Sequence, residues 1–239
     1  MKCGVRSAEC GVRSVVCGFI LLILVLAIIP SPLWGEGKSL PPKYLSGGEG
    51  AASDDILSKL QAAYSDVHDL TADFVQRSSI QGFEEKVFKG KLYLKKPKLA
   101  RWDYTKPVKQ NIFIKDEKII LYFHEQKQAI VQKASDHPDA EPAMGLLSNI
   151  EKWQDMFTIK GEDTAADSFK MELYPKSMSM VVKVIVEIEK KGFYINKLTL
   201  YEKSGNRVSF DFSGIKFNSG LKDSLFDFKI PKGVEVLEY

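Results

Sequence analysis

The stretch GKLYLKKPKLARWDY, residues 90–104, contains two runs in which apolar and polar side chains alternate. In the first run Leu92 and Leu94 alternate with lysines, and in the second Trp102 and Tyr104 alternate with charged residues. A period of two places every second side chain on the same face of a β-strand. We therefore predict two neighbouring strands of a sheet that has one apolar and one polar face.

Similar alternation recurs along most of the chain, before and after this stretch. It starts at Leu70, returns through Val184 and Val186, and returns again through Phe210 and Phe212. After the glycine at position 214 the apolar residues change parity, which predicts a β-bulge. About eleven strands and two helices, joined mostly by short turns, favour a mainly β fold of the α+β type, built on one curved antiparallel sheet.

Two neighbouring runs, Ile112–Ile114 and Ile119–Phe123, are apolar on both parities. The short polar segment Asp116–Lys118 between them predicts a tight turn. Strands of this composition are typical of positions that are covered on both faces. We therefore expect this pair of strands in the centre of the sheet.

Helical spacing of apolar residues occurs in two places. Leu57, Leu60 and Tyr64 recur at the spacing of one helix face, and Ser53 is a suitable N-terminal cap for that helix. A second helix is predicted over Ala143–Trp153, where apolar residues recur at a similar spacing.

The first 35 residues have the composition of a secretory signal peptide. Basic side chains precede the apolar run Val15–Ile29, which is shorter than the ~20 residues of a membrane-spanning helix. The alternative is an uncleaved N-terminal anchor, because the run is strongly apolar. All three cysteines lie in this segment, so the exported part of the chain has no cysteine with which to form a disulfide.

The remaining sequence divides into a lead-in and one domain. Residues 36–52 are rich in proline, glycine and serine, which predicts disorder. Residues 53–239 are long enough to bury a core as a single domain without disulfides. Without residues 1–35 the chain keeps 31 basic and 30 acidic side chains, and this balance argues against nucleic-acid binding.

The sequence offers little for catalysis or metal binding. The histidines at positions 68, 124 and 137 lack the spacing of a metal site, and we expect them on the surface. The sequence contains no G-x-S-x-G, no H-E-x-x-H and no phosphate-binding glycine loop. We therefore predict no enzymatic activity, no metal and no cofactor. A hydrolase remains an alternative, because catalytic groups can come together from distant positions.

Apolar bulk on one face of the predicted sheet is the more informative feature. Aromatic residues on an inner face usually form a core. However, two helices are too few to cover about eleven strands, so the sheet must close on itself or leave an apolar hollow. Such a hollow suits acyl chains, which bind by burying apolar area. The aromatic residues on this face are Phe74, Phe88, Trp102, Tyr104, Phe210 and Phe212.

One basic residue breaks the apolar pattern. By parity Lys96 follows Leu92 and Leu94 onto the apolar face, just before Pro97 ends the strand. A buried lysine is costly unless it is paired. Either its ammonium group reaches water at the strand end, or it forms a polar latch at the mouth of the hollow. Gln76, on the same face, could likewise bond a lid or a neighbouring loop.

The strand pair at residues 90–104 resembles that of the LolA family, the periplasmic carriers of outer-membrane lipoproteins. Further segments agree in the same order. Phe74-Val-Gln76 resembles the family's F-x-Q, Lys115–Ile119 lies at its S-D-G-K turn, and Pro231–Val236 resembles its closing P-x-G-V-x-V. The resemblance covers residues 53–239, although Glu117 replaces the glycine of that turn.

The resemblance implies an incomplete antiparallel β-barrel of eleven strands, with helices forming a lid over an apolar cavity. It implies a monomeric periplasmic chaperone without covalent chemistry. Acylated lipoproteins would come from an ABC transporter in the inner membrane and pass to an acceptor at the outer membrane. The expected acyl-chain cavity consists of Phe74, Phe88, Leu92, Leu94, Trp102, Tyr104, Ile112, Ile114, Met144, Leu147, Val184, Val186, Phe210 and Phe212.

The resemblance also assigns the latch. In the family an arginine just before the strand-ending proline hydrogen-bonds the lid, and Lys96 occupies that position. Lysine keeps the charge but lacks the planar guanidinium fork. We expect Lys96, with Gln76, to hold the lid. The substitution leaves an alternative open, in which a protein of the same fold binds a free lipid or glycolipid or senses mislocalised lipoproteins.

Overall fold

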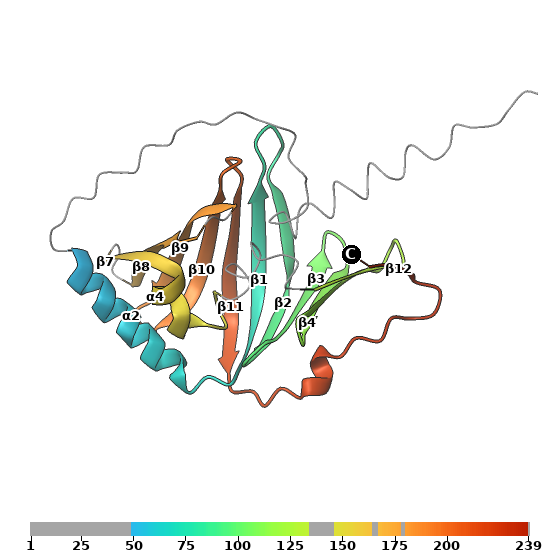
Figure 1. Ribbon diagram of the computed structural model, residues 1–239, viewed down its shortest axis with the longest axis horizontal. Helices are drawn as coiled ribbons and strands as arrows, with labels where there is room; N and C mark the ends of the chain where they lie inside the picture. Colours follow the sequence, from blue (N-terminus) through green and yellow to red (C-terminus); the bar gives the residue numbers. More distant parts are fainter. Residues whose placement is uncertain (1–48, 134–145, 164–166, 178–179, 239) are drawn as a thin grey trace, which may run out of the picture. The chain divides into compact units, whose positions relative to one another are not determined.

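Twelve strands of the described chain form one sheet (Figure 1). The computed structural model describes residues 49–133, 146–163, 167–177 and 180–238, which belong to one unit spanning residues 44–239. The strands are β1 (Asp69–Ser79), β2 (Lys86–Lys95), β3 (Leu99–Lys106), β4 (Gln110–Lys115), β5 (Lys118–Phe123), β6 (Gln128–Lys133), β7 (Phe157–Asp163), β8 (Ser168–Pro175), β9 (Val181–Glu189), β10 (Tyr194–Glu202), β11 (Arg207–Phe217) and β12 (Glu235–Glu238). The helices are α2 (Glu49–Ser65), α4 (Trp153–Met156) and the 3-10 turns η2 (Ile150–Lys152) and η3 (Asp223–Phe226).

The strand order confirms an open, incomplete barrel. It runs β12-β6-β5-β4-β3-β2-β1-β11-β10-β9-β8-β7, and β12 and β7 lie at its two ends. Most neighbours are consecutive and antiparallel, while the β1–β11 pair joins the two halves of the sheet. The twelfth strand, one more than the sequence predicts, is the short β12, which pairs in parallel with β6.

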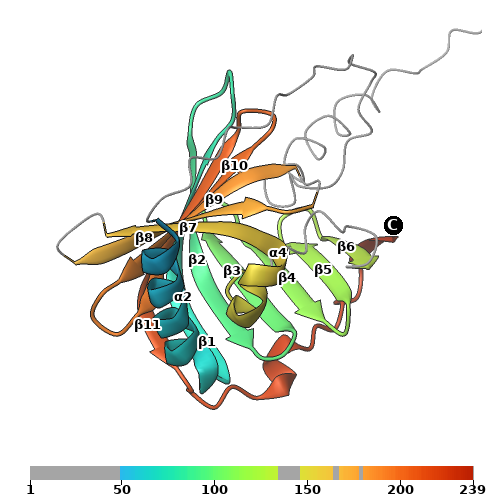
Figure 2. The ribbon, with the colours of Figure 1, turned by 60° about the vertical axis from the view of Figure 1, so that its left-hand side comes forward.

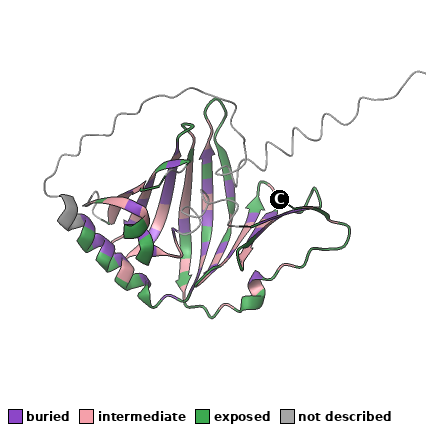
Figure 3. Ribbon diagram, viewed as in Figure 1, coloured by how far each residue is buried: buried purple, intermediate pink, exposed green. Residues whose placement is uncertain are grey.

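The alternation of the sequence sets the two faces of this sheet. Buried and exposed residues alternate along β1 (Figure 3). Phe74 and Gln76 are among its buried residues. The curved sheet turns its apolar face inward, and α2 and α4 lie over this concave face (Figure 2). Among the described residues, no helix is long and apolar enough to cross a membrane. The predicted signal peptide lies outside the described residues.

Helix α2 starts earlier than the sequence suggests. It begins at Glu49, so Ser53 lies inside the helix, and the prediction that Ser53 caps it is wrong. Ser53 is buried against β7 because Gly161 has no side chain: a Cβ at Gly161 would lie 2.9 Å from the Ser53 Cα. Most of the predicted lead-in lies outside the described residues, but its last residues, 49–52, are helical.

The second helix is much shorter than predicted. Residues 143–145 lie outside the described chain, and the segment after them forms a turn followed by η2 and the single-turn helix α4. The apolar residues Leu146, Ile150 and Trp153 are all buried. Successive short turns, and not one long helix, bring these three side chains to the same side. The Trp153 indole Nε1 donates to the Leu146 carbonyl at 3.0 Å.

Two local predictions about the backbone are confirmed. The β1–β11 register shifts between Thr71 and Asp73, where β11 carries an extra residue next to Gly214, as a β-bulge requires. Asp116 and Glu117 form the tight turn between β4 and β5, with φ values of 50° and 63°. These positive angles suit a two-residue hairpin turn, although a non-glycine residue is strained there.

Strands β4 and β5 are covered on both faces, but they are not central. They lie near the β12 end of the sheet. Residues 218–234, which we call the C-terminal strap, cross the convex face before β12. Phe228 of the strap stacks on Phe113 of β4 with ring centroids 4.6 Å apart, and also packs against Tyr122 of β5. The apolar residues of β4 and β5 that point to the convex face therefore pack against the strap.

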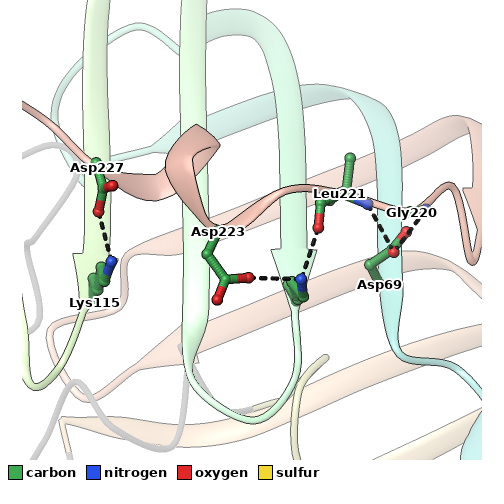
Figure 4. A network of polar contacts seen from close by, with 7 residues as sticks. Asp69, Lys115, Gly220, Leu221, Asp223 and Asp227 are labelled. Atoms are coloured by element: carbon green, nitrogen blue, oxygen red, sulfur yellow. Dashed lines mark hydrogen bonds and ion pairs between the residues drawn. The ribbon is translucent and has the colours of Figure 1, made fainter.

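Polar contacts fasten the strap along its length (Figure 4). The buried Asp69 carboxylate accepts the backbone N–H groups of Ser219, Gly220 and Leu221 at 2.6, 2.9 and 3.0 Å. Further along, Lys95 pairs with Asp223 at 2.6 Å and Lys115 with Asp227 at 2.5 Å. The strap is thus held from β1 to β4.

Candidate functional site

The concave face carries an aromatic cluster in the middle of the sheet. Phe74 of β1 makes edge-to-face contacts with Trp102 and Tyr104 of β3, at centroid distances of 5.1 and 4.9 Å. Phe210 of β11 reaches Trp102 at 5.4 Å and stacks on Phe212 at 6.2 Å. Strands far apart in the sequence therefore supply one continuous apolar surface.

A glycine makes room for the central ring of this cluster. Gly90 of β2 pairs with Phe74 of β1. A Cβ on Gly90 would lie 2.6 Å from the Phe74 ring and 2.2 Å from the Asp103 carbonyl oxygen. The absence of a side chain at Gly90 thus allows the Phe74 ring to lie across the sheet.

A short row of hydrogen-bonded polar side chains borders the aromatic cluster. The Tyr104 hydroxyl donates to Gln76 Oε1 at 2.7 Å, and Gln76 Nε2 donates to the Ser78 hydroxyl at 2.9 Å. Burial without a charged partner raises the pKa of Tyr104. The side-chain hydrogen bonds of Gln76 therefore remain within the sheet, where they satisfy a buried amide, and do not reach a helix.

The residues expected to line the cavity share the concave face but differ in exposure. Trp102, Phe210, Ile114 and Leu147 are half-buried. Met144 lies outside the described residues. The others are buried, namely Phe74, Phe88, Leu92, Leu94, Tyr104, Ile112, Val184, Val186 and Phe212.

Lys96 contacts the helix over the concave face. Its Nζ donates to the Tyr64 carbonyl in the last turn of α2 at 2.9 Å, and its backbone N–H donates to the His68 carbonyl at 2.9 Å. An ammonium group at a helix C-terminus satisfies an unpaired carbonyl and interacts favourably with the helix dipole. The half-buried side chain thus ties α2 to the end of β2. A cavity of ≈ 10 Å³ beside it is lined in part by Tyr64, Leu94 and Leu147.

Further contacts hold α2 to the sheet. The Tyr64 hydroxyl accepts the backbone N–H of Ile195 on β10 at 3.1 Å, and its burial raises the pKa of Tyr64 to about 12. Gln61 Nε2 donates to the Ile150 carbonyl of η2 at 3.3 Å. The sequence places Tyr64 on the apolar side of the helix, but the role of its carbonyl and hydroxyl depends on distant strands and has no local signal.

The described residues contain no group of three or more histidine, cysteine or acidic side chains that could hold a metal ion. His124 lies on the surface, where its ring Nε2 is 2.6 Å from Asn111 Oδ1. His68 is also exposed, and His137 lies outside the described residues.

An open sheet with one apolar face and a helix fastened over it defines a half-barrel binding protein. Residues 65–229 match the family model for the outer membrane lipoprotein carrier protein LolA. The chain therefore belongs to the LolA family.

Individual relatives agree with this membership. The chain is 29% identical to the outer-membrane lipoprotein carrier protein of Methylococcus capsulatus, over 76% of this chain and 86% of that protein. It is 27% identical to the carrier protein of the same name from Francisella philomiragia, over 78% and 88% of the two chains. A conserved, uncharacterized protein of Thermus thermophilus shares the fold, with a TM-score of 0.51 at 11% identity over 78% of this chain and 98% of that chain.

Proposed function

We propose that this protein is a periplasmic lipoprotein carrier. It binds the acyl chains of lipoproteins that an inner-membrane ABC transporter releases, and it carries them to an acceptor at the outer membrane. Family membership supports the class of cargo. The transporter, the acceptor and the periplasmic location are part of the proposal.

The observation that carries the proposal is the aromatic concave face with α2 fastened over it. Trp102 and Phe210 remain half-buried beside fully buried neighbours. An acyl chain laid on these rings would gain ~0.8 kcal/mol for each buried methylene. Movement of α2 would enlarge the apolar surface, but it would break the hydrogen bonds of Lys96, Tyr64 and Gln61 that fasten the helix. Burial of the cargo's acyl chains would have to offset that cost.

The direct test is release of lipoproteins from inner-membrane spheroplasts. We expect the purified protein to release them as soluble one-to-one complexes, and to bind a fluorescent acyl probe. Trp102→Ala should weaken probe binding about tenfold, because it removes apolar contact area. Phe83→Ala is the matched control: Phe83 lies in the connection between β1 and β2 and is 74% exposed. A protein that releases nothing and binds no probe would contradict the proposal.

The alternative of a free lipid, a glycolipid or a sensing role has its own signature. Mass spectrometry of organic extracts from the purified protein would then find a small lipid bound. If such a lipid co-purifies and spheroplasts release no lipoprotein, the alternative replaces the carrier function.

The latch gives a second test of the proposed function. Lys96→Leu removes the hydrogen bond to Tyr64 and its charge at the helix end, a loss of about 1–2 kcal/mol. We expect faster hydrogen exchange in the last turn of α2 and impaired cargo transfer. Lys96→Arg keeps a charged donor and should preserve both. Unchanged transfer in Lys96→Leu, with an intact fold, would show that the hydrogen bond from Lys96 to Tyr64 does not control transfer.

A further inference from the structure

A glutamine on β6 is buried without hydrogen-bond partners. Gln132 is 1% exposed, and neither its Nε2 nor its Oε1 has a partner among the described residues. Gln128, by contrast, keeps a bond from its Nε2 to Glu235 at 3.0 Å. An unpaired buried amide costs about 1–3 kcal/mol. A bound group that pairs with both atoms would remove this cost.

The register of the sheet places Gln132 at the end of an apolar row. It pairs with Ile119 of β5, which is fully buried, and Ile119 pairs with Ile114 of β4. The row continues across β3 and β2 through Ala100 and Leu94. All of these side chains share the concave face, because directly paired residues point to the same side.

The far end of this row lies beside the latch. Leu94 pairs with Leu70 of β1, and both line the small cavity next to Lys96. Five strand intervals of ~4.8 Å separate β6 from β1, so the row spans on the order of 24 Å. One leaflet of a membrane has a hydrocarbon depth of about 15 Å. The row is therefore long enough for an extended acyl chain.

The chemistry of the side chain selects the group at the end of that acyl chain. A primary amide offers a donor and an acceptor side by side. In an extended acylated residue, the N–H of the acyl amide and the carbonyl of the same residue point to one side and can pair with Oε1 and Nε2 together. An ester has no N–H and leaves Oε1 unpaired. An unpaired polar group in a binding site is the usual basis of strong discrimination.

We propose that Gln132 pairs with the amide that joins an acyl chain to the cargo, while the chain itself lies along Ile119, Ile114 and Ala100. This inference rests on the proposed carrier function and adds a preference for amide-linked over ester-linked chains. Gln132 is then a specificity-determining residue of the concave face.

The test uses two lipopeptides of the same peptide sequence and acyl length, one acylated through an amide and the other through an ester. We expect the full-length protein to bind the amide-linked lipopeptide about tenfold more tightly, which corresponds to one well-made hydrogen bond. Gln132→Met should bind the two lipopeptides equally. It should also raise the melting temperature, because an apolar side chain of similar shape replaces an unpaired amide.

Lys133→Met is the matched control. Lys133 follows directly in the chain, is exposed and points to the opposite face. This variant should keep the tenfold preference. Equal binding of both lipopeptides by the original protein, or a preference that survives in Gln132→Met, would overturn the inference and leave the carrier function standing. Binding of neither lipopeptide would contradict the carrier function and the inference together.

Discussion

At the scale of single residues, Gly90 has a role that its position in a strand does not suggest. Gly90→Ala would place a Cβ against the Asp103 carbonyl oxygen, a backbone atom that cannot move freely, and against the Phe74 ring. We expect the free energy of unfolding to fall by about 3 kcal/mol, as in other overpacked sites. Chemical denaturation measures this change.

The matched control is Gly82→Ala, in the connection between β1 and β2. Gly82 has a φ of 84°, and a Cβ added to it would meet no atom within 4 Å. This variant therefore adds backbone strain of about 1 kcal/mol without a clash. Equal losses in the two variants would contradict the explanation by crowding.

Tyr64 links stability to alkaline pH. Burial raises its pKa from about 10 in the unfolded chain to about 12 in the folded protein. Above pH 10 the unfolded chain loses the phenol proton while the folded protein keeps it, so the free energy of unfolding falls as pH rises from 10 to 12. Between pH 9 and pH 11, Tyr64→Phe should reduce this decrease by about 1.3 kcal/mol, because pH 11 lies one unit above the unfolded pKa and one unit below the folded one. Denaturation at pH 9 and pH 11 compares the two proteins, and an identical decrease in both would exclude Tyr64 as the cause.

The residues of the concave face were largely predictable, and their polar partners were not. Parity alone brings Trp102 and Phe210 to one surface, because a period of two assigns faces without any knowledge of neighbours. The bond from Lys96 to Tyr64 and the unpaired amide of Gln132 depend on how distant elements pack. The break in parity at Lys96 predicts a polar contact there, but no local pattern identifies Tyr64 as its partner or Gln132 as unpaired.

At the scale of elements, the C-terminal strap depends most on its first attachment. Asp69→Ala removes the carboxylate that accepts three backbone N–H groups, and we expect a loss of about 2–4 kcal/mol with faster hydrogen exchange at Ser219–Leu221. Asp223→Ala breaks an exposed ion pair with Lys95 instead, and its effect on stability should be much smaller. A strap that stays protected in Asp69→Ala would contradict this assignment.

The elements also show where sequence patterns stop being informative. Ile112–Ile114 and Ile119–Phe123 are covered on both faces as predicted, but the pattern cannot say what covers them. The cover is Phe226 and Phe228 of an irregular strap, so these strands need not be central. In the same way, the spacing of Leu146, Ile150 and Trp153 fits short turns as well as a helix.

At the scale of the whole molecule, the two edges of the sheet differ. The β7 edge packs against α2, whereas β6 would be an open edge without β12. Open edges pair readily with other chains. Removal of residues 234–239 should therefore increase concentration-dependent association relative to the full chain, as measured by sedimentation velocity. Removal of residues 238–239 keeps three of the four β12–β6 residue pairs and should leave association as it is in the full chain. Equal association of the longer deletion and the full chain would contradict this role of β12.

The central β1–β11 seam sets the order of events when the chain is made. Its partners, such as Phe74 and Phe212, come from opposite ends of the domain. Pairing between such distant segments is slow, because a long loop must close first. Strands β1 to β6 are made before β11, so their aromatic face stays uncovered until β11 has been synthesised. The newly made chain thus passes through a period in which its own apolar surface needs protection from association with other chains.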